Sequence, residues 1–339
     1  MHRSNGYNDF EWAINPNRLM LKIIGLWPPD NRDSHQIVKL KFQRLCSFIT
    51  LLFVITIPSL MSLIRVWGDM ILMIDNMQYS LPLSMAVLKI CIIWYKQEVI
   101  APLIDMIERD WVKVKIKEER NIMLRCARIA RAITICGMFM IFFAMISLFG
   151  LPFLEITKSY ATNLTDFGKH LPIQTYYLHD VTKSPQYELT LLAQTFATSI
   201  GGICYIAIDN LFGLLVFHIC GQLENLHLRL THMKKYPNYD EVLKYNVQDH
   251  IRLIRSIEII DDSFNLMLLG LVLYFAILFC LQGFLIVNVI IQKDQLSVMQ
   301  LGWIVVATVS VILHMCLYCA VGEILLMQKA LEISYKIMQ

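Results

Sequence analysis

The feature that most limits the fold is a series of six apolar segments, each long enough to cross a lipid bilayer. A spanning helix needs about 20 predominantly apolar residues, and only a helix satisfies its own backbone hydrogen bonds in hydrocarbon. The segments cover residues 42–64, 70–94, 129–151, 189–217, 266–291 and 301–318. Only 17% of the residues are charged, against about 25% in a soluble domain. We therefore expect an all-α polytopic membrane protein.

Three polar connections divide the spans. The basic segments 96–128 and 218–262 carry apolar residues at helical spacing, which predicts helices that continue beyond the membrane. Residues 152–188 form a long polar loop, and loops above about 15 residues are uncommon unless they are functional or disordered. We expect a transmembrane domain over residues 1–319, followed by a cytoplasmic tail over 320–339.

The distribution of Lys and Arg predicts the orientation, because cytoplasmic loops carry an excess of these residues. Of the 30 Lys and Arg residues, 24 lie on the side of the amino terminus, the two basic segments and the carboxyl tail, and five lie on the other side. We expect a cytoplasmic amino terminus and an outward-facing 152–188 loop. The acceptor triplet that starts at Asn163 in that loop agrees, since such a triplet is glycosylated only in a secretory lumen.

Catalytic and cofactor motifs are missing from this sequence. It contains no P-loop, no GxSxG and no HExxH, so we expect neither an enzyme nor a cofactor. The nine cysteines are odd in number and none lies in the long polar loop, which argues against a disulfide framework, and we expect no metal site. Lys89 and Asp209 are the two clearest charges inside predicted spans, where a buried charge is costly. Two interpretations stay open for them, a helix anchor and part of an ion path.

A cluster of aromatic, aliphatic and polar side chains in the outer halves of the spans is the candidate ligand site. On single helix faces lie Tyr79, Leu83 and Val87 in the second span, Phe142, Ile146 and Phe149 in the third, and Gln194 and Thr198 in the fourth. An apolar cluster with one or two polar groups suits a small, mostly apolar ligand. Ordinary helix packing is the alternative explanation for the same residues.

Several short motifs, spread over most of the chain, together resemble the insect odorant receptors. They are Trp27-Pro28 near the start; Leu171-Pro172, Tyr176-Tyr177 and Ser184-Pro185-x-Tyr187-Glu188 in the long loop; Asp209-Asn210-Leu211-Phe212, His218 and the run 222–226 after the fourth span; and Leu317-Tyr318-Cys319 with Gly322-Glu323 after the sixth. The resemblance implies a lid formed by the long loop over the ligand region, with Leu171-Pro172 and Tyr176-Tyr177 folding back toward the helices.

The resemblance also implies an activity. Members of this family are odorant-binding tuning subunits of ligand-gated, non-selective cation channels in the plasma membrane of olfactory sensory neurons. They form hetero-tetramers with a shared co-receptor subunit, and they bind small volatile odorants in the outer half of the helices. The expected partners are therefore an apolar odorant, the co-receptor and the lipid bilayer, with no nucleic acid. The same implication places the odorant among the eight residues of the candidate site and favours ligand contact for Tyr79, Phe142, Ile146, Phe149 and Thr198.

The family has seven spans, and residues 320–339 are too polar to form the seventh. We therefore expect six of its seven helices, with the chain ending before the pore helix. A gustatory-receptor-like channel subunit has the same topology and stays an alternative. A G-protein-coupled receptor needs an outside amino terminus, which the charge distribution opposes. A transporter or membrane enzyme needs broken helices in matched halves or intramembrane acid–base pairs, and neither is evident.

Overall fold

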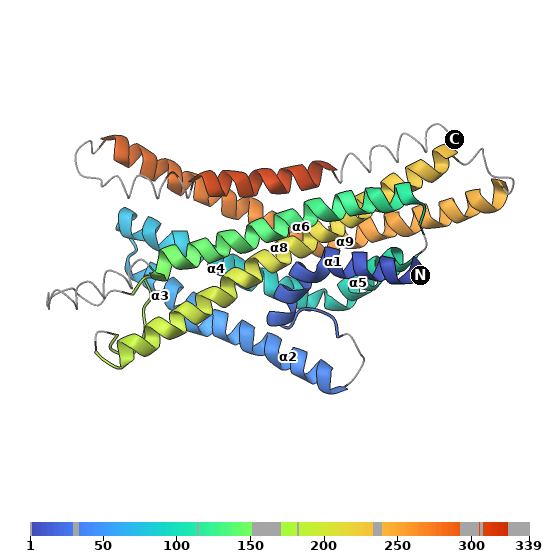
Figure 1. Cartoon of the computed structure of the whole chain (residues 1–339). Coiled ribbons are helices and arrows are strands. Elements are labelled where there is room, and N and C mark those ends of the chain that lie inside the picture. The colour runs from blue at the N-terminus through green and yellow to red at the C-terminus, as the bar shows by residue number, and fades with distance from the viewer. Residues whose placement is uncertain are drawn as a thin grey trace. The chain divides into compact units, whose positions relative to one another are not determined.

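The computed structural model describes residues 2–29, 34–113, 115–150, 171–181, 183–232, 239–291, 305 and 308–324. Every regular element within those residues is a helix (Figure 1). The predicted all-α fold is confirmed. Asn163 and residues 325–339 lie outside the described part of the chain, so the glycosylation site and the boundary of the tail stay predictions.

The described helices account for most of the chain. In chain order they are α1 (His2–Ile23), α2 (Ser34–Ile49), η1 (Thr50–Thr56), α3 (Ile57–Arg65), α4 (Met70–Tyr95), α5 (Gln97–Val112), α6 (Lys117–Met145), η2 (Ile146–Gly150), α8 (Gln186–His232) and α9 (Tyr239–Ile291). A further short helix covers Thr308–Ile324. The elements η1 and η2 are π-helical stretches within longer helices, where the backbone hydrogen bonds span one residue more than in an α-helix.

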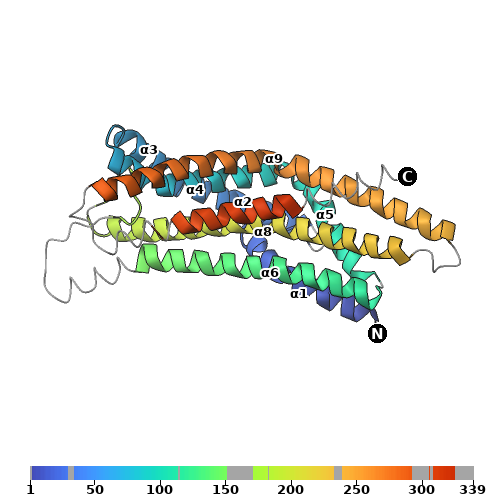
Figure 2. The same cartoon turned by 90° about the horizontal axis from the view of Figure 1, so that it is seen from above.

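The predicted spans coincide with observed helices. Among the described residues, five helices are long and apolar enough to cross a membrane: Ser34–Arg65, Met70–Tyr95, Lys117–Gly150, Gln186–His232 and Asp240–Val287. The sixth predicted segment, 301–318, overlaps the shorter apolar helix Thr308–Ile324. Helices α8 and α9 reach 47 and 53 residues, well beyond the apolar segments that predicted them (Figure 2). The basic segments 96–128 and 218–262 are helical over most of their described residues.

The chain forms two compact units. The first contains Met1–Ala13, Glu98–Ala130 and Phe212–Gln339, and the second contains Ile14–Gln97 and Arg131–Leu211. The divisions fall inside α1, α5, α6 and α8, so each of these helices contributes residues to both units.

Close helix packing holds the second unit together. The start of α4 is capped by Asp69, whose Oδ1 accepts from the backbone N–H groups of Ile71 and Leu72 at 3.1 and 3.2 Å. Further along, α4 meets α8 at Gly201, where an added Cβ would lie 2.8 Å from Leu51 Cδ1 and 3.3 Å from Leu83 Cδ2. A small residue lets the helices approach to this distance, which is a common solution between membrane helices.

Candidate functional site

The segment 171–181 folds back onto the helices of the second unit, as the sequence led us to expect. The backbone N–H of Tyr176 donates to the carbonyl of Pro58 at 2.9 Å, and the Tyr177 hydroxyl donates to the carbonyl of Val54 at 2.9 Å. Pro58 explains the second bond, because proline has no N–H with which to bond the carbonyl four residues earlier. The Tyr177 phenol therefore supplies a donor to a carbonyl that has lost its usual helical partner.

Two buried amide side chains, on α4 and α8, form hydrogen bonds with the same segment. Gln194 of α8 donates through Nε2 to the Ile173 carbonyl at 3.1 Å and to Thr175 Oγ1 at 2.9 Å. Asn76 of α4 donates through Nδ2 to the Gln174 carbonyl at 3.1 Å. Gln194 is 0% exposed and Asn76 is 1% exposed. Three successive residues of the segment are therefore fixed to α4 and α8.

The more exposed side of the segment is also attached. The Arg65 guanidinium, at the end of α3, lies 3.4 Å from the centroid of the Tyr176 ring in a cation–π contact. The His179 ring nitrogen lies 2.8 Å from Thr190 Oγ1 on α8. Burial raises the pKa of the Tyr177 phenol, although nearby Thr175 and Gln194 oppose that effect through hydrogen bonds.

The structure brings together some of the eight predicted ligand residues. On α4, Leu83 is buried at the contact with α8, and Tyr79 and Val87 are half-buried on the same helix. On α8, Thr198 is buried and its Oγ1 donates to the Gln194 carbonyl at 2.7 Å.

The three predicted ligand residues of α6 and η2 are placed differently. Phe142 is 65% exposed and Ile146 is 47% exposed, while Phe149 is half-buried. Only the α4 and α8 residues therefore belong to a closed, partly polar region. Ligand contact stays a prediction for all eight residues.

Lys89 and Asp209, which the sequence placed inside predicted spans, form one ion pair. Lys89 is fully buried, and its ammonium is bonded to Asp209 and lies 3.3 Å from the centroid of the Tyr205 ring. The pair connects α4 to α8. The contact favours the helix-anchor interpretation over the ion path, because each charge has a partner within the helices.

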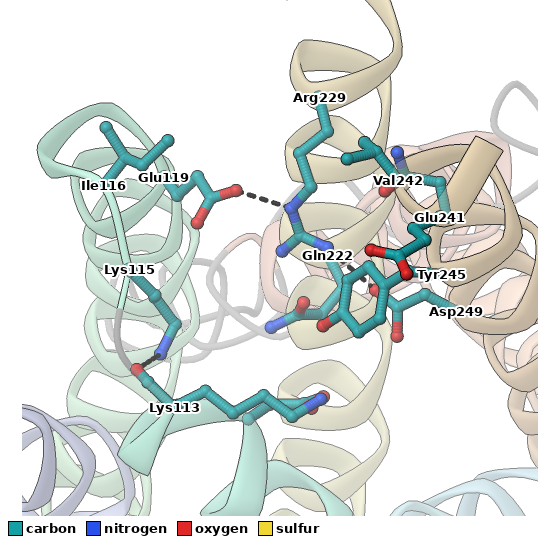
Figure 3. Close-up of a pocket in the computed structure, with 12 residues that line it drawn as sticks. Lys113, Lys115, Ile116, Glu119, Gln222, Arg229, Glu241, Val242, Tyr245 and Asp249 are labelled. Atoms are coloured by element: carbon teal, nitrogen blue, oxygen red, sulfur yellow. Dashed lines mark hydrogen bonds and ion pairs between the residues drawn. The ribbon is translucent and has the colours of Figure 1, made fainter. Parts of the chain in front are cut away.

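A polar cavity of about 480 Å³ lies in the first unit. Its lining includes Lys113 and Lys115 from the connection between α5 and α6, together with residues of α6, α8 and α9 (Figure 3). Burial lowers the pKa of Lys115 to about 8, although the carboxylates of Asp110 and Glu119 oppose the shift. No group of three or more His, Cys, Asp or Glu among the described residues is placed to hold a metal ion.

A chain of ion pairs forms one side of this cavity. Figure 3 shows Arg229 of α8 between two carboxylates, with Glu119 of α6 at 2.5 Å and Asp249 of α9 at 3.0 Å. Asp249 also pairs with Arg252 at 2.7 Å, one turn further along α9. The charges alternate in sign, so each buried group has an opposite charge beside it and three helices are joined.

Asp110 of α5 extends this chain to a fourth helix. Its side chain is 1% exposed, with one oxygen 2.7 Å from Arg252 and the other 3.2 Å from His218 Nε2. Burial alone would raise the pKa of the Asp110 carboxyl, but the hydrogen bonds and charges of His218 and Arg252 hold it well below its usual range. The sequence did not predict this network, whose partners lie up to 142 residues apart.

The family described as 7tm Odorant receptor matches residues 69–337. Odorant receptor 13a of Drosophila melanogaster is 28% identical over 133 residues, which cover 36% of this chain and 31% of that protein. The match therefore spans about a third of the relative's length.

Solved structures share the fold. The insect olfactory receptor OR5 from Machilis hrabei superposes with a TM-score of 0.74 at 17% identity, covering 95% of this chain and 81% of that chain. The same receptor in complex with eugenol gives a TM-score of 0.71 at 17% identity, covering 92% and 78%. With its apolar helices, this chain is a multi-pass membrane protein. The match over residues 69–337 shows that the chain belongs to the 7tm odorant receptor family.

Proposed function

We propose that this chain is an odorant-binding tuning subunit of a ligand-gated, non-selective cation channel. It acts with a shared co-receptor subunit in the plasma membrane of olfactory sensory neurons, with its amino terminus in the cytoplasm and the 152–188 loop outside. Family membership supports the receptor function. The related OR5, whose structure was solved with eugenol, supports a small organic ligand.

One observation carries the location of the ligand. The segment 171–181 is fastened over α3, α4 and α8 by bonds to Pro58, Val54, Asn76 and Gln194. A segment held by this many bonds closes that end of the second unit and leaves buried polar groups among apolar side chains, as ligand sites require. We therefore place the odorant beneath this segment, against the faces of α4 and α8 that carry the candidate residues.

Recording from cells tests the proposal. The chain is expressed with an insect co-receptor subunit, and currents are recorded while a panel of volatile alcohols, esters, ketones and terpenes is applied. We expect currents that depend on the odorant and that are missing when the co-receptor is expressed alone. Binding to the purified chain, measured by the shift of its melting temperature, separates ligand recognition from conduction. A chain that neither binds nor responds to any compound of the panel would contradict the proposed function.

The orientation has its own test. An enzyme that removes N-linked glycans should lower the apparent mass of the chain made in cells, and Asn163→Gln should remove that change. An epitope tag at the amino terminus should be stained only after the cells are permeabilised. Staining of intact cells would contradict the cytoplasmic amino terminus.

A further inference from the structure

Two buried amides beneath the segment 171–181 donate hydrogen bonds to it, two from Gln194 and one from Asn76, and each retains an unused acceptor. Gln194 Oε1 and Asn76 Oδ1 are both buried, and neither has a hydrogen-bond partner among the residues that the structure describes. A buried polar atom without a partner destabilises the fold, and more than about 90% of buried polar groups in proteins are paired. These two oxygens therefore require a donor.

The orientation of both amides is determined by their partners. Each amide nitrogen bonds a backbone carbonyl of the segment, that of Ile173 for Gln194 and that of Gln174 for Asn76, and a carbonyl only accepts hydrogen bonds. The nitrogen of each amide must face its carbonyl, so the oxygen must face elsewhere. Exchanging the nitrogen and oxygen of either amide would place two acceptors against each other.

Two serine hydroxyls belong to the same region. Ser59 follows Pro58, whose carbonyl receives the N–H of Tyr176, and Ser80 lies one turn along α4 from Asn76, on the same face. Both serines are buried, and their Oγ atoms also lack a partner within the described part of the chain. The end of the second unit that the segment closes therefore concentrates unused neutral polar atoms, among which the amide oxygens can only accept.

We propose that Gln194 Oε1 and Asn76 Oδ1 form a hydrogen-bond-accepting subsite for the hydroxyl group of a small alcohol or phenol. This inference rests on the proposed function and names the class of odorant. An alcohol donates its O–H to the amide oxygens and buries its hydrocarbon against α4 and α8. Its methyl ether has the same skeleton but no proton to donate, so it leaves both acceptors unpaired. An alkylammonium would bring a charge to neutral amides, which is costly away from water.

Matched ligands give the first test. Dissociation constants are measured on the purified chain for straight-chain and aromatic alcohols, each beside its methyl ether and its parent hydrocarbon. We expect each alcohol to bind about tenfold or more tightly than its ether, since one unpaired buried acceptor costs about 1–3 kcal/mol. Equal binding of alcohol and ether overturns the inference and leaves the proposed function standing. Failure of every compound to bind overturns the proposed function itself.

Matched variants give the second test. Gln194→Met removes the acceptor and retains the length of the side chain, so the ratio of ether to alcohol dissociation constants should fall toward one. Thr175→Val removes one partner of the same amide but leaves the acceptor, and the ratio should stay at its wild-type value. A wild-type ratio in Gln194→Met overturns the inference. Asn76→Leu is the second variant if Gln194→Met does not fold, and the wild-type ligand comparison needs no variant.

Discussion

The ammonium of Lys89 lies 2.5 Å from a carboxylate oxygen of Asp209, and the Tyr205 ring lies beside it. Removing one partner of a buried ion pair leaves an uncompensated charge and costs about 3–5 kcal/mol, whereas replacing both with apolar residues is often nearly neutral. We expect Lys89→Met and Asp209→Leu each to destabilise the chain strongly, and the double variant to be more stable than either. Melting temperatures in detergent check this, and additive losses would contradict the pair.

The Tyr177 hydroxyl gives a prediction that depends on Pro58. Tyr177→Phe removes the donor to the Val54 carbonyl and should cost about 1 kcal/mol. Pro58→Ala restores a backbone N–H at position 58, which can bond that carbonyl in a regular helix. In the Pro58→Ala background, Tyr177→Phe should therefore cost less. A double-mutant cycle of unfolding free energies measures the difference, and an equal cost in both backgrounds would show that the phenol does not replace the missing helical donor.

The sequence predicted the helices better than it predicted their contacts. Apolar length alone located the five long spans, because crossing hydrocarbon requires a helix. Apolar residues at helical spacing in the segment 218–262 also predicted that helices continue beyond the membrane there, and α8 and α9 do so. The sequence missed the π-helical stretch η1, although Pro58 marks its end.

The sequence likewise identified individual residues of the candidate site but not the contacts between them. Lys89 and Asp209 were each recognised as charges within spans, but their pairing depends on how residues 120 apart are brought together. Gln194 was predicted as a ligand residue from its helix face, and the structure adds that its amide also holds the segment 171–181. Phe142 and Ile146 satisfied the same helical spacing but are exposed in the structure. Helical periodicity identifies residues that share a face, and it does not show which element packs against that face.

Two glycines of α8 predict opposite responses to the same substitution. A Cβ at Gly213 meets nothing within 4 Å, so Gly213→Ala should stabilise the helix by up to about 1 kcal/mol. A Cβ at Gly201 would lie 2.8 Å from Leu51 Cδ1, so Gly201→Ala gains the same helical preference but displaces a packed side chain. We expect Gly201→Ala to melt at a lower temperature than Gly213→Ala. The reverse order would contradict the close approach of α8 to η1 and α4.

Asp110 predicts how stability falls in acid. The pKa of its carboxyl is lower in the folded chain than the value of about 3.9 expected when unfolded. Its contribution to stability is therefore complete above that unfolded value and is lost as the pH falls toward the folded value. Asp110→Asn removes this contribution, so its melting temperature should depend less on pH in the acid range than that of the wild type. Asp105→Asn, at an exposed position of the same helix, is the matched control. Parallel pH profiles for Asp110→Asn and the wild type would show that the bonds to His218 and Arg252 do not stabilise the ionised carboxylate.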